Sequence, residues 1–168
     1  MTIKAGDRLP EGKLTEATEF DNAAGCPLNP QDISVTDASK GKKIVIFGVP
    51  GAYTPTCSAK HVPGFVANHD KLKAKGVDEV WCVAVNDAFV MGAWGRGQKA
   101  TGKVRMLGDG SAEYTKKLGL ELDLNARGLG LRMQRFAMIV QDGVVKDIAV
   151  EAAGKFEVSS AEAVLTKL

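Results

Sequence analysis

Cys57 lies in a short stretch whose residue types and spacing favour a reactive sulfur. The stretch, residues 49–65, follows an apolar and β-branched run at 44–47 that is typical of a buried strand. Two prolines and a glycine then predict a tight loop, and the residues after the loop predict a helix. Cys57 is therefore expected in the first turn of a helix that directly follows a strand.

The start of a helix is a place where a cysteine can be ionised. Pro55 suits the first turn, because its missing N–H would have no partner there, and Thr54 or Thr56 is expected to cap the helix. Unpaired backbone N–H groups and the positive end of the helix dipole favour a thiolate at Cys57. The alternative is an inert buried cysteine, which is the commoner state of this residue type.

Composition and charge indicate an ordinary globular protein. The 168 residues are 45% hydrophobic and 25% charged, which predicts a single domain over 1–168. A net charge of +2, with basic and acidic residues interspersed, gives no reason to expect a nucleic-acid or membrane partner. No apolar run approaches the ~18 residues of a membrane span. Residues 1–7 lack the apolar core of a secretory signal, so a cytoplasmic location is expected.

The three cysteines, Cys26, Cys57 and Cys82, form no C-x-x-C pair. An odd number in a chain of this length argues against a disulfide framework and fits a reducing compartment. With only two histidines and no cluster at ligand spacing, no metal site is predicted. No cofactor is predicted either, because the glycine-rich run 95–100 falls inside an expected helix and does not follow a strand.

The order of expected elements predicts an α/β fold. Strands are expected at 13–20, 33–35, 44–49, 79–85, 104–107, 134–140 and 144–150, and helices at 58–74, 88–99, after Ser111 and at 161–167. Cys26 is expected in a loop, Pro63 is expected to bend its helix, Asp87 to cap the next, and residues 159–162 to form a capping box. This order suggests a mixed central sheet with helices on both faces.

The pattern Pro50-x-x-x-Thr54-x-x-Cys57 resembles the active-site signature of the peroxiredoxins. Its wider context, from Gly48 through His61-Val62-Pro63-Gly64-Phe65, resembles the type II (peroxiredoxin-five) branch. The resemblance covers residues 3–168. It implies a thioredoxin-like fold with a peroxiredoxin N-terminal extension, a thiol-dependent peroxidase activity, and a homodimer formed through the active-site face.

Cleavage of a peroxide by a thiolate needs two aligned oxygens and a stabilised leaving oxygen. The Thr54 hydroxyl is expected to point at the sulfur and at a peroxide oxygen, although it could serve only as a turn or cap. Pro50 is expected to close the pocket against water, although it could be a plain turn residue. The backbone N–H groups of Thr56 and Cys57 are expected to bind the peroxide.

The site also needs a fixed positive charge, and arginine suits it because it stays protonated. The resemblance assigns this role to Arg135, at the start of the strand before the Asp-Gly hairpin and directly before an aromatic residue. Arg132 is the fallback, and for either residue a solvated surface charge is the ordinary alternative. His61, one turn after Cys57, is expected to face the same pocket or to be an ordinary helix residue. Arg96 is expected to support the site from behind.

The implied cycle begins with attack of Cys57 on hydrogen peroxide or an alkyl hydroperoxide, which leaves a sulfenic acid that a thiol must reduce. Some type II members carry a resolving cysteine near the C-terminus, but residues 154–160 contain none. Cys82 is a possible resolving residue, though expected to be buried in a strand, and Cys26 is expected to be an incidental thiol. The favoured interpretation is a one-cysteine mechanism, with glutathione and glutaredoxin, or thioredoxin, as a separate reductant.

Two other functions are compatible with a reactive cysteine. A thioredoxin-like thiol–disulfide oxidoreductase is disfavoured by the lack of a C-x-x-C pair. A redox sensor or holdase would use the same sulfenic acid as a signal. Turnover separates these functions, because a sensor consumes peroxide once, whereas a peroxidase cycles with excess reductant.

Overall fold

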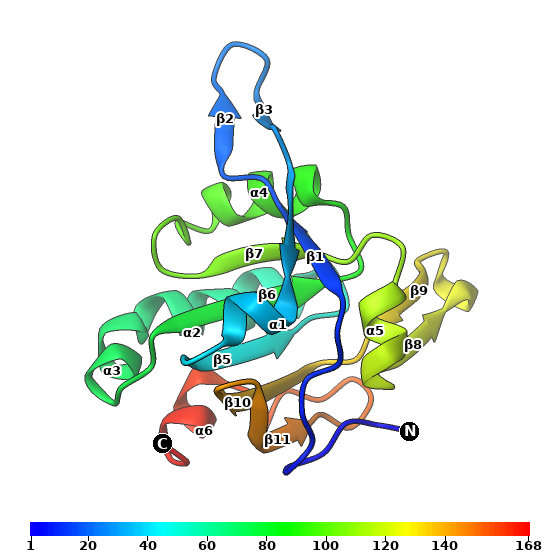
Figure 1. Ribbon diagram of the computed structural model, residues 1–168. Coiled ribbons are helices and arrows are strands. Elements are labelled where there is room, and N and C mark those ends of the chain that lie inside the picture. Colours follow the sequence, from blue (N-terminus) through cyan, green and yellow to red (C-terminus); the bar gives the residue numbers. More distant parts are fainter.

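A seven-stranded sheet forms the centre of the computed structural model, which describes residues 1–168 (Figure 1). Its strands are β1 (Lys13–Glu16), β4 (Gln31–Ser34), β5 (Lys43–Gly48), β6 (Glu79–Ala84), β7 (Arg105–Gly108), β10 (Phe136–Gln141) and β11 (Val144–Val150). They lie in the order β11-β10-β5-β6-β7-β1-β4. The pairs β5–β6 and β6–β7 are parallel, and all other neighbours are antiparallel. The sheet is mixed, as the sequence predicts.

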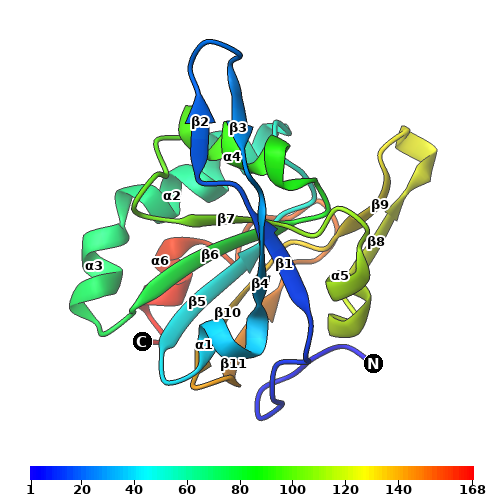
Figure 2. The same cartoon turned by 45° about the horizontal axis from the view of Figure 1, so that its top comes forward.

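Helices cover both faces of this sheet (Figures 1 and 2). On one face lie α1 (Val35–Ser39) and α5 (Glu113–Leu118), and on the other lie α2 (Val62–Ala67), α3 (His69–Ala74), α4 (Ala88–Gly97) and α6 (Ala161–Leu165). Two hairpins lie outside the sheet, formed by β2 (Glu19–Asp21) with β3 (Cys26–Leu28) and by β8 (Glu121–Leu124) with β9 (Gly130–Met133). No helix has the length and apolarity needed to cross a bilayer.

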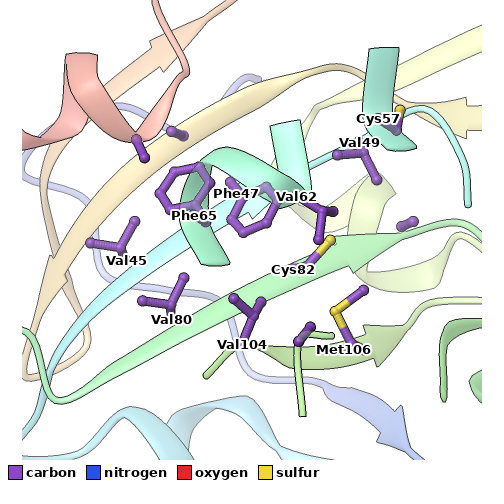
Figure 3. Packing of buried hydrophobic residues seen from close by; sticks show 14 of the residues in the cluster. Val45, Phe47, Val49, Cys57, Val62, Phe65, Val80, Cys82, Val104 and Met106 are labelled. Atoms are coloured by element: carbon purple, nitrogen blue, oxygen red, sulfur yellow. The ribbon is translucent and has the colours of Figure 1, made fainter. Parts of the chain in front are cut away.

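The central strand β5 shows how the sequence produces this layered fold. Val45 and Phe47 point into the apolar cluster under α2, while Ile44 and Ile46 point into the cluster on the opposite face. Because side chains alternate along a strand, a strand covered on both faces reads as a continuous apolar run. The same alternation on β6 puts Cys82 on the α2 side (Figure 3). Cys57 and Cys82 therefore belong to one buried cluster.

The helix after Cys57 differs from the predicted single helix over 58–74. It begins at Pro55, continues through a π-helical turn at Cys57–His61, and is then interrupted at Asn68 between α2 and α3. The distortion expected at Pro63 takes the form of the π turn before it, because a wider turn leaves room for the proline ring. The Asn68 side chain donates to the Gly64 carbonyl at 2.8 Å, and this local bond marks the interruption.

Three other local predictions were wrong. Ser111 does not cap α5, because the Asp109 carboxylate accepts from the first backbone N–H groups of that helix. Ser160 caps α6 alone, and Glu162 accepts from Asn68 instead of closing a capping box. Cys26 starts strand β3 and does not lie in a loop. For the two helix starts, neighbouring polar side chains could each have served as the cap.

The two hairpins outside the sheet were not predicted, and the expected strand 13–20 is divided between β1 and β2. The sequences of β8, ELDL, and β9, GLRM, carry charges and lack the β-branched residues that indicate a strand. The Asp87 cap of α4 is confirmed, since its carboxylate accepts from Val90 N at 2.8 Å. The turn between β10 and β11 is also confirmed, with Asp142 and Gly143 both at positive φ, as a tight hairpin requires.

Candidate active site

Cys57 lies where the loop after β5 becomes a helix. The helix begins at Pro55, and the first intrahelical bond runs from Ser58 N to the Thr54 carbonyl at 3.0 Å. The backbone N–H groups of Thr56 and Cys57 precede that bond, so they have no intrahelical acceptor. The Cys57 side chain is fully buried and forms part of the apolar cluster under α2 (Figure 3). The predicted position of Cys57 in the first helical turn is confirmed.

Several side chains fix the loop between β5 and this helix. The Thr54 hydroxyl donates to the Gly51 carbonyl at 2.7 Å, and Asn86 accepts from Ala52 N at 2.9 Å. Tyr53 adopts a left-handed conformation with φ of 59°, which is uncommon for a residue other than glycine. Because the Thr54 hydroxyl proton is used inside the loop, its oxygen is left as a hydrogen-bond acceptor. Thr54 stands at the N-cap position, because its carbonyl accepts the first helical bond, but its hydroxyl donates inside the loop. No side-chain cap bond forms at Thr56.

Arg135 reaches the sulfur from the strand next to β5. Phe136, the first residue of β10, pairs with Gly48, the last residue of β5, so this register places Arg135 beside the start of the Cys57 loop. Its Nη2 donates to Cys57 Sγ at 3.1 Å. Arg132 does not take this role, because its Nη1 donates to the Pro50 carbonyl at 3.0 Å. A guanidinium at this distance makes a charge-assisted hydrogen bond to the sulfur.

His61 lies behind Arg135 and does not face the pocket. Its ring is fully buried, with Nε2 2.8 Å from the Ser159 carbonyl and Nδ1 2.8 Å from Arg135 Nη1. Burial, and next the charge of Arg135, lower the pKa of His61 to about 3, so the ring is neutral near pH 7. The expectation that His61 binds substrate is therefore corrected, because both of its nitrogens contact protein groups.

A cavity of about 150 Å³ opens beside these residues. Its lining includes Pro50, Thr56 and Arg135 together with the segment 151–155, whereas the fully buried Cys57 side chain is not part of the lining. This arrangement brings together three of the residues predicted for the site. The volume admits a peroxide with a small substituent, and Arg135 contributes a positive charge to the lining.

Three other residues named from the sequence do not line the cavity. Arg96 does not support the site, because its guanidinium stacks 3.8 Å from the Phe20 ring and donates to Asn22, which holds the β2–β3 hairpin. Cys82 is fully buried, and burial, together with nearby Cys57, raises the pKa of its thiol well above the usual value. Cys26 is exposed on the same hairpin, which projects from the edge of the sheet (Figure 1).

Glu151 and Ser159 were not identified from the sequence, although they contact the site. Glu151 follows β11, lines the cavity, and accepts hydrogen bonds from the Ser159 backbone and hydroxyl. Ser159 in turn contacts His61, 98 residues away. No local pattern reveals contacts across such a separation, and only the fold brings these residues together.

The fold and this site define a thioredoxin-fold protein whose chemistry depends on a cysteine at the start of a helix, and residues 4–165 match the Redoxin family. Peroxiredoxin-2B of Arabidopsis thaliana is 48% identical over 166 residues, which cover 99% of this chain and 98% of the relative. The chain belongs to the type II peroxiredoxins. It is a thiol-dependent peroxidase, which acts on a peroxide and needs a thiol reductant.

Solved structures agree with this assignment. Reduced Prx3 of Vibrio vulnificus in complex with H2O2 has a TM-score of 0.89 and 46% identity, and 99% of each chain is covered. A Burkholderia cenocepacia protein described as a thioredoxin reductase has a TM-score of 0.92 and 57% identity, with 100% of this chain and 99% of that chain covered. The present sequence has no C-x-x-C pair, which a thiol–disulfide oxidoreductase of the thioredoxin type carries.

Proposed function

We propose that the protein reduces hydrogen peroxide and small alkyl hydroperoxides by a one-cysteine mechanism, with an external thiol as reductant. One observation carries the proposal. Arg135 Nη2 lies 3.1 Å from the Cys57 sulfur, beside a cavity of about 150 Å³ that Pro50 and Thr56 line. Arg135 thus links the buried nucleophile to a space that can hold two oxygens, and it supplies the fixed positive charge that cleavage of an O–O bond requires.

The first step uses the residues around the cavity. The Cys57 thiolate attacks the terminal peroxide oxygen, so an S–O bond forms as the O–O bond breaks. The leaving hydroxide or alkoxide takes a proton to become water or an alcohol, and Cys57 becomes a sulfenic acid. The N–H groups of Thr56 and Cys57 and the Arg135 guanidinium stabilise the developing negative charge, and the Thr54 oxygen accepts from the peroxide O–H. Pro50 lines the cavity and, having no backbone N–H, offers no donor that would compete for the peroxide.

The burial of Cys82 supports an external reductant. A Cys57–Cys82 disulfide needs Cα atoms ~4.4–6.8 Å apart and an ionised attacking thiol. Cys82 is fully buried within strand β6, and the raised pKa of its thiol disfavours attack. Cys26 lies on the projecting hairpin, and residues 152–160 contain no cysteine. Glutathione with glutaredoxin, or thioredoxin, therefore reduces the sulfenic acid, releasing water and regenerating the thiol.

Steady-state turnover tests this mechanism directly. Peroxide consumption is measured with glutaredoxin and glutathione, and in parallel with thioredoxin, for the wild type and for the variants Cys57→Ser, Cys82→Ala and Cys26→Ser. We expect loss of turnover only in Cys57→Ser, and a single sulfenic acid that dimedone traps on Cys57. Loss of turnover in Cys82→Ala with both reductants would overturn the one-cysteine mechanism. Stoichiometric consumption by the wild type with both reductants would favour a sensor.

A homodimer through the active-site face is part of the same proposal. The exposed aromatic residues Tyr53 and Phe89, 64% and 48% accessible, support it, because Tyr53 packs near Trp94 on α4, the helix that also carries Phe89. Phe89→Lys is expected to shift the sedimentation coefficient from dimer to monomer, whereas the matched change Leu129→Lys, on the β8–β9 hairpin, leaves it unchanged. A monomeric wild type at micromolar concentration contradicts this part. A cytoplasmic location remains a prediction.

A further inference from the structure

The His61 ring makes two contacts that only one of its states can satisfy. Arg135 has only donors, so His61 Nδ1 must accept from Arg135 Nη1. The Ser159 carbonyl has only lone pairs, so Nε2 must carry the proton and donate to it. A neutral ring protonated at Nε2 makes both bonds. Every other state of the ring loses at least one of them.

Glu151 holds the carbonyl that selects this state. Its carboxylate accepts four hydrogen bonds within 2.7–2.9 Å, from the backbone N–H groups of Glu157, Val158 and Ser159 and from the Ser159 hydroxyl. Burial alone would raise the pKa of Glu151, but these bonds outweigh it and lower the pKa. The Glu151 backbone N–H also donates to the Arg135 carbonyl at 2.9 Å. Glu151 therefore contacts both Ser159 and Arg135.

The segment that Glu151 holds also closes over the arginine. The Phe156 ring meets the His61 ring edge-on, with ring centres 5.0 Å apart. The Arg135 guanidinium carbon lies 5.8 Å from the centre of the Phe156 ring. Arg135 thus has the imidazole on one side and an aromatic ring on another, and its remaining free direction is toward the sulfur and the cavity.

We propose that Glu151, Ser159 and His61 form a positioning chain that fixes the Arg135 guanidinium on the Cys57 sulfur and on the peroxide. A free arginine side chain has many rotamers, and a donor stabilises a transition state best when it is fixed before the reaction. The inference deepens the proposed function and rests on it. His61 is a positioning residue in this proposal, because it acts on the reacting atoms only through Arg135.

Three substitutions of His61 separate its two contacts. In His61→Asn, the amide oxygen lies near the position of Nδ1 and can still accept from Arg135. In His61→Gln, the longer side chain reaches the position of Nε2 and keeps only the Ser159 contact. His61→Leu removes both contacts and keeps an apolar side chain. His69→Leu is the matched control, because the only partner of His69 at ion-pair distance is the exposed Asp70.

Two reagents distinguish positioning from a general loss of structure. Hydrogen peroxide needs Arg135 aligned on its oxygens, whereas iodoacetamide needs only the ionised sulfur. We expect His61→Gln and His61→Leu to react with peroxide about 10- to 150-fold more slowly than the wild type, which is the cost of one lost charge-assisted bond. His61→Asn is expected within about fivefold of the wild type. For His61→Gln and His61→Leu, alkylation by iodoacetamide is expected to slow less than peroxide oxidation, because a displaced guanidinium weakens its bond to the sulfur but alkylation has no peroxide oxygen to stabilise.

The same chain is tested at its other end by Glu151→Ala. The expected result is slower oxidation by peroxide, with ¹⁵N spectra of His61 that lose the signature of a ring protonated only at Nε2. The wild type must show that signature, and a ring protonated at Nδ1 would overturn the proposal. So would peroxide oxidation of His61→Leu within threefold of the wild type, or a parallel loss with both reagents. A wild type without Cys57-dependent peroxide consumption would instead overturn the proposed function itself. The positioning role of Glu151, Ser159 and His61 would then fall as well.

Discussion

Replacement of Arg135 by lysine tests whether the shape of the guanidinium matters or only its charge. In the wild type, Nη2 lies 3.1 Å from Cys57 Sγ and Nη1 lies 2.8 Å from His61 Nδ1, so one planar group makes two bonds in fixed directions. The single ammonium of Arg135→Lys keeps the charge but cannot make both bonds in that geometry. The loss of one charge-assisted hydrogen bond costs about 1.5–3 kcal/mol, which corresponds to a rate about 10- to 150-fold lower.

The rate of Cys57 oxidation measures this loss without any reductant. Trp94 Nε1 donates to the hydroxyl of Ser58, the neighbour of Cys57, so tryptophan fluorescence in a stopped-flow experiment should report the oxidation. Arg96→Lys is the control, because Arg96 contacts the β2–β3 hairpin and not the sulfur. A second-order rate constant for Arg135→Lys within threefold of the wild type would refute the reasoning, since charge alone would then be sufficient.

Three further predictions concern the loop, the sheet and the buried histidine. An added Cβ in Gly51→Ala would overlap Arg132 Nη1, so that Arg132 must leave the Pro50 carbonyl to which it donates. We expect peroxide oxidation to be several-fold slower and the melting temperature to be almost unchanged. In Gly108→Ala, the new Cβ would lie 2.7–3.0 Å from backbone atoms of residues 86–88, which cannot yield, so urea unfolding should show a loss of about 1–3 kcal/mol. Below pH 6.5 the His61 ring binds a proton in the unfolded protein, whereas in the folded protein it stays neutral until about pH 3, because its pKa is lowered there. The free energy of unfolding therefore falls as the pH decreases from 6.5 to about 3. Between pH 6.5 and 5, urea titrations should show a loss of roughly 2 kcal/mol that is absent in His61→Leu, and equal slopes in both proteins would contradict the assignment.

The parts of the site that the sequence predicts lie close together along the chain. The strand, the proline-rich loop and the helix start fall within residues 44–65, where short-range signals for turns and helix termini operate. Cys57 and its place in the first helical turn follow from those signals. Arg135, 78 residues away, could be named only through the family resemblance. Its contact depends on the register of β10 against β5, which no local pattern specifies.

The role of His61 could not be predicted because it depends on partners that are distant in the chain. A histidine one turn after a reactive cysteine suggests a group that faces substrate. The structure instead places both ring nitrogens against Arg135 and Ser159, 74 and 98 residues away. Asp109 illustrates the same difficulty over a shorter range, because its carboxylate takes the capping role that Ser111 was expected to have. Polar side chains with several possible partners are where local reasoning fails.

The contrast between Cys57 and Cys82 shows what makes one buried cysteine a nucleophile. Both side chains are fully buried, and both belong to the same apolar cluster (Figure 3). Cys82 lies within a strand whose backbone N–H groups serve the sheet, and burial raises the pKa of its thiol. Cys57 lies at a helix start with unpaired N–H groups and accepts from Arg135. Burial is therefore common to the two residues, and the donors supplied by the helix start and by β10 are what distinguish them. A donor placed beside Cys82 would be needed before that residue could compete as a nucleophile.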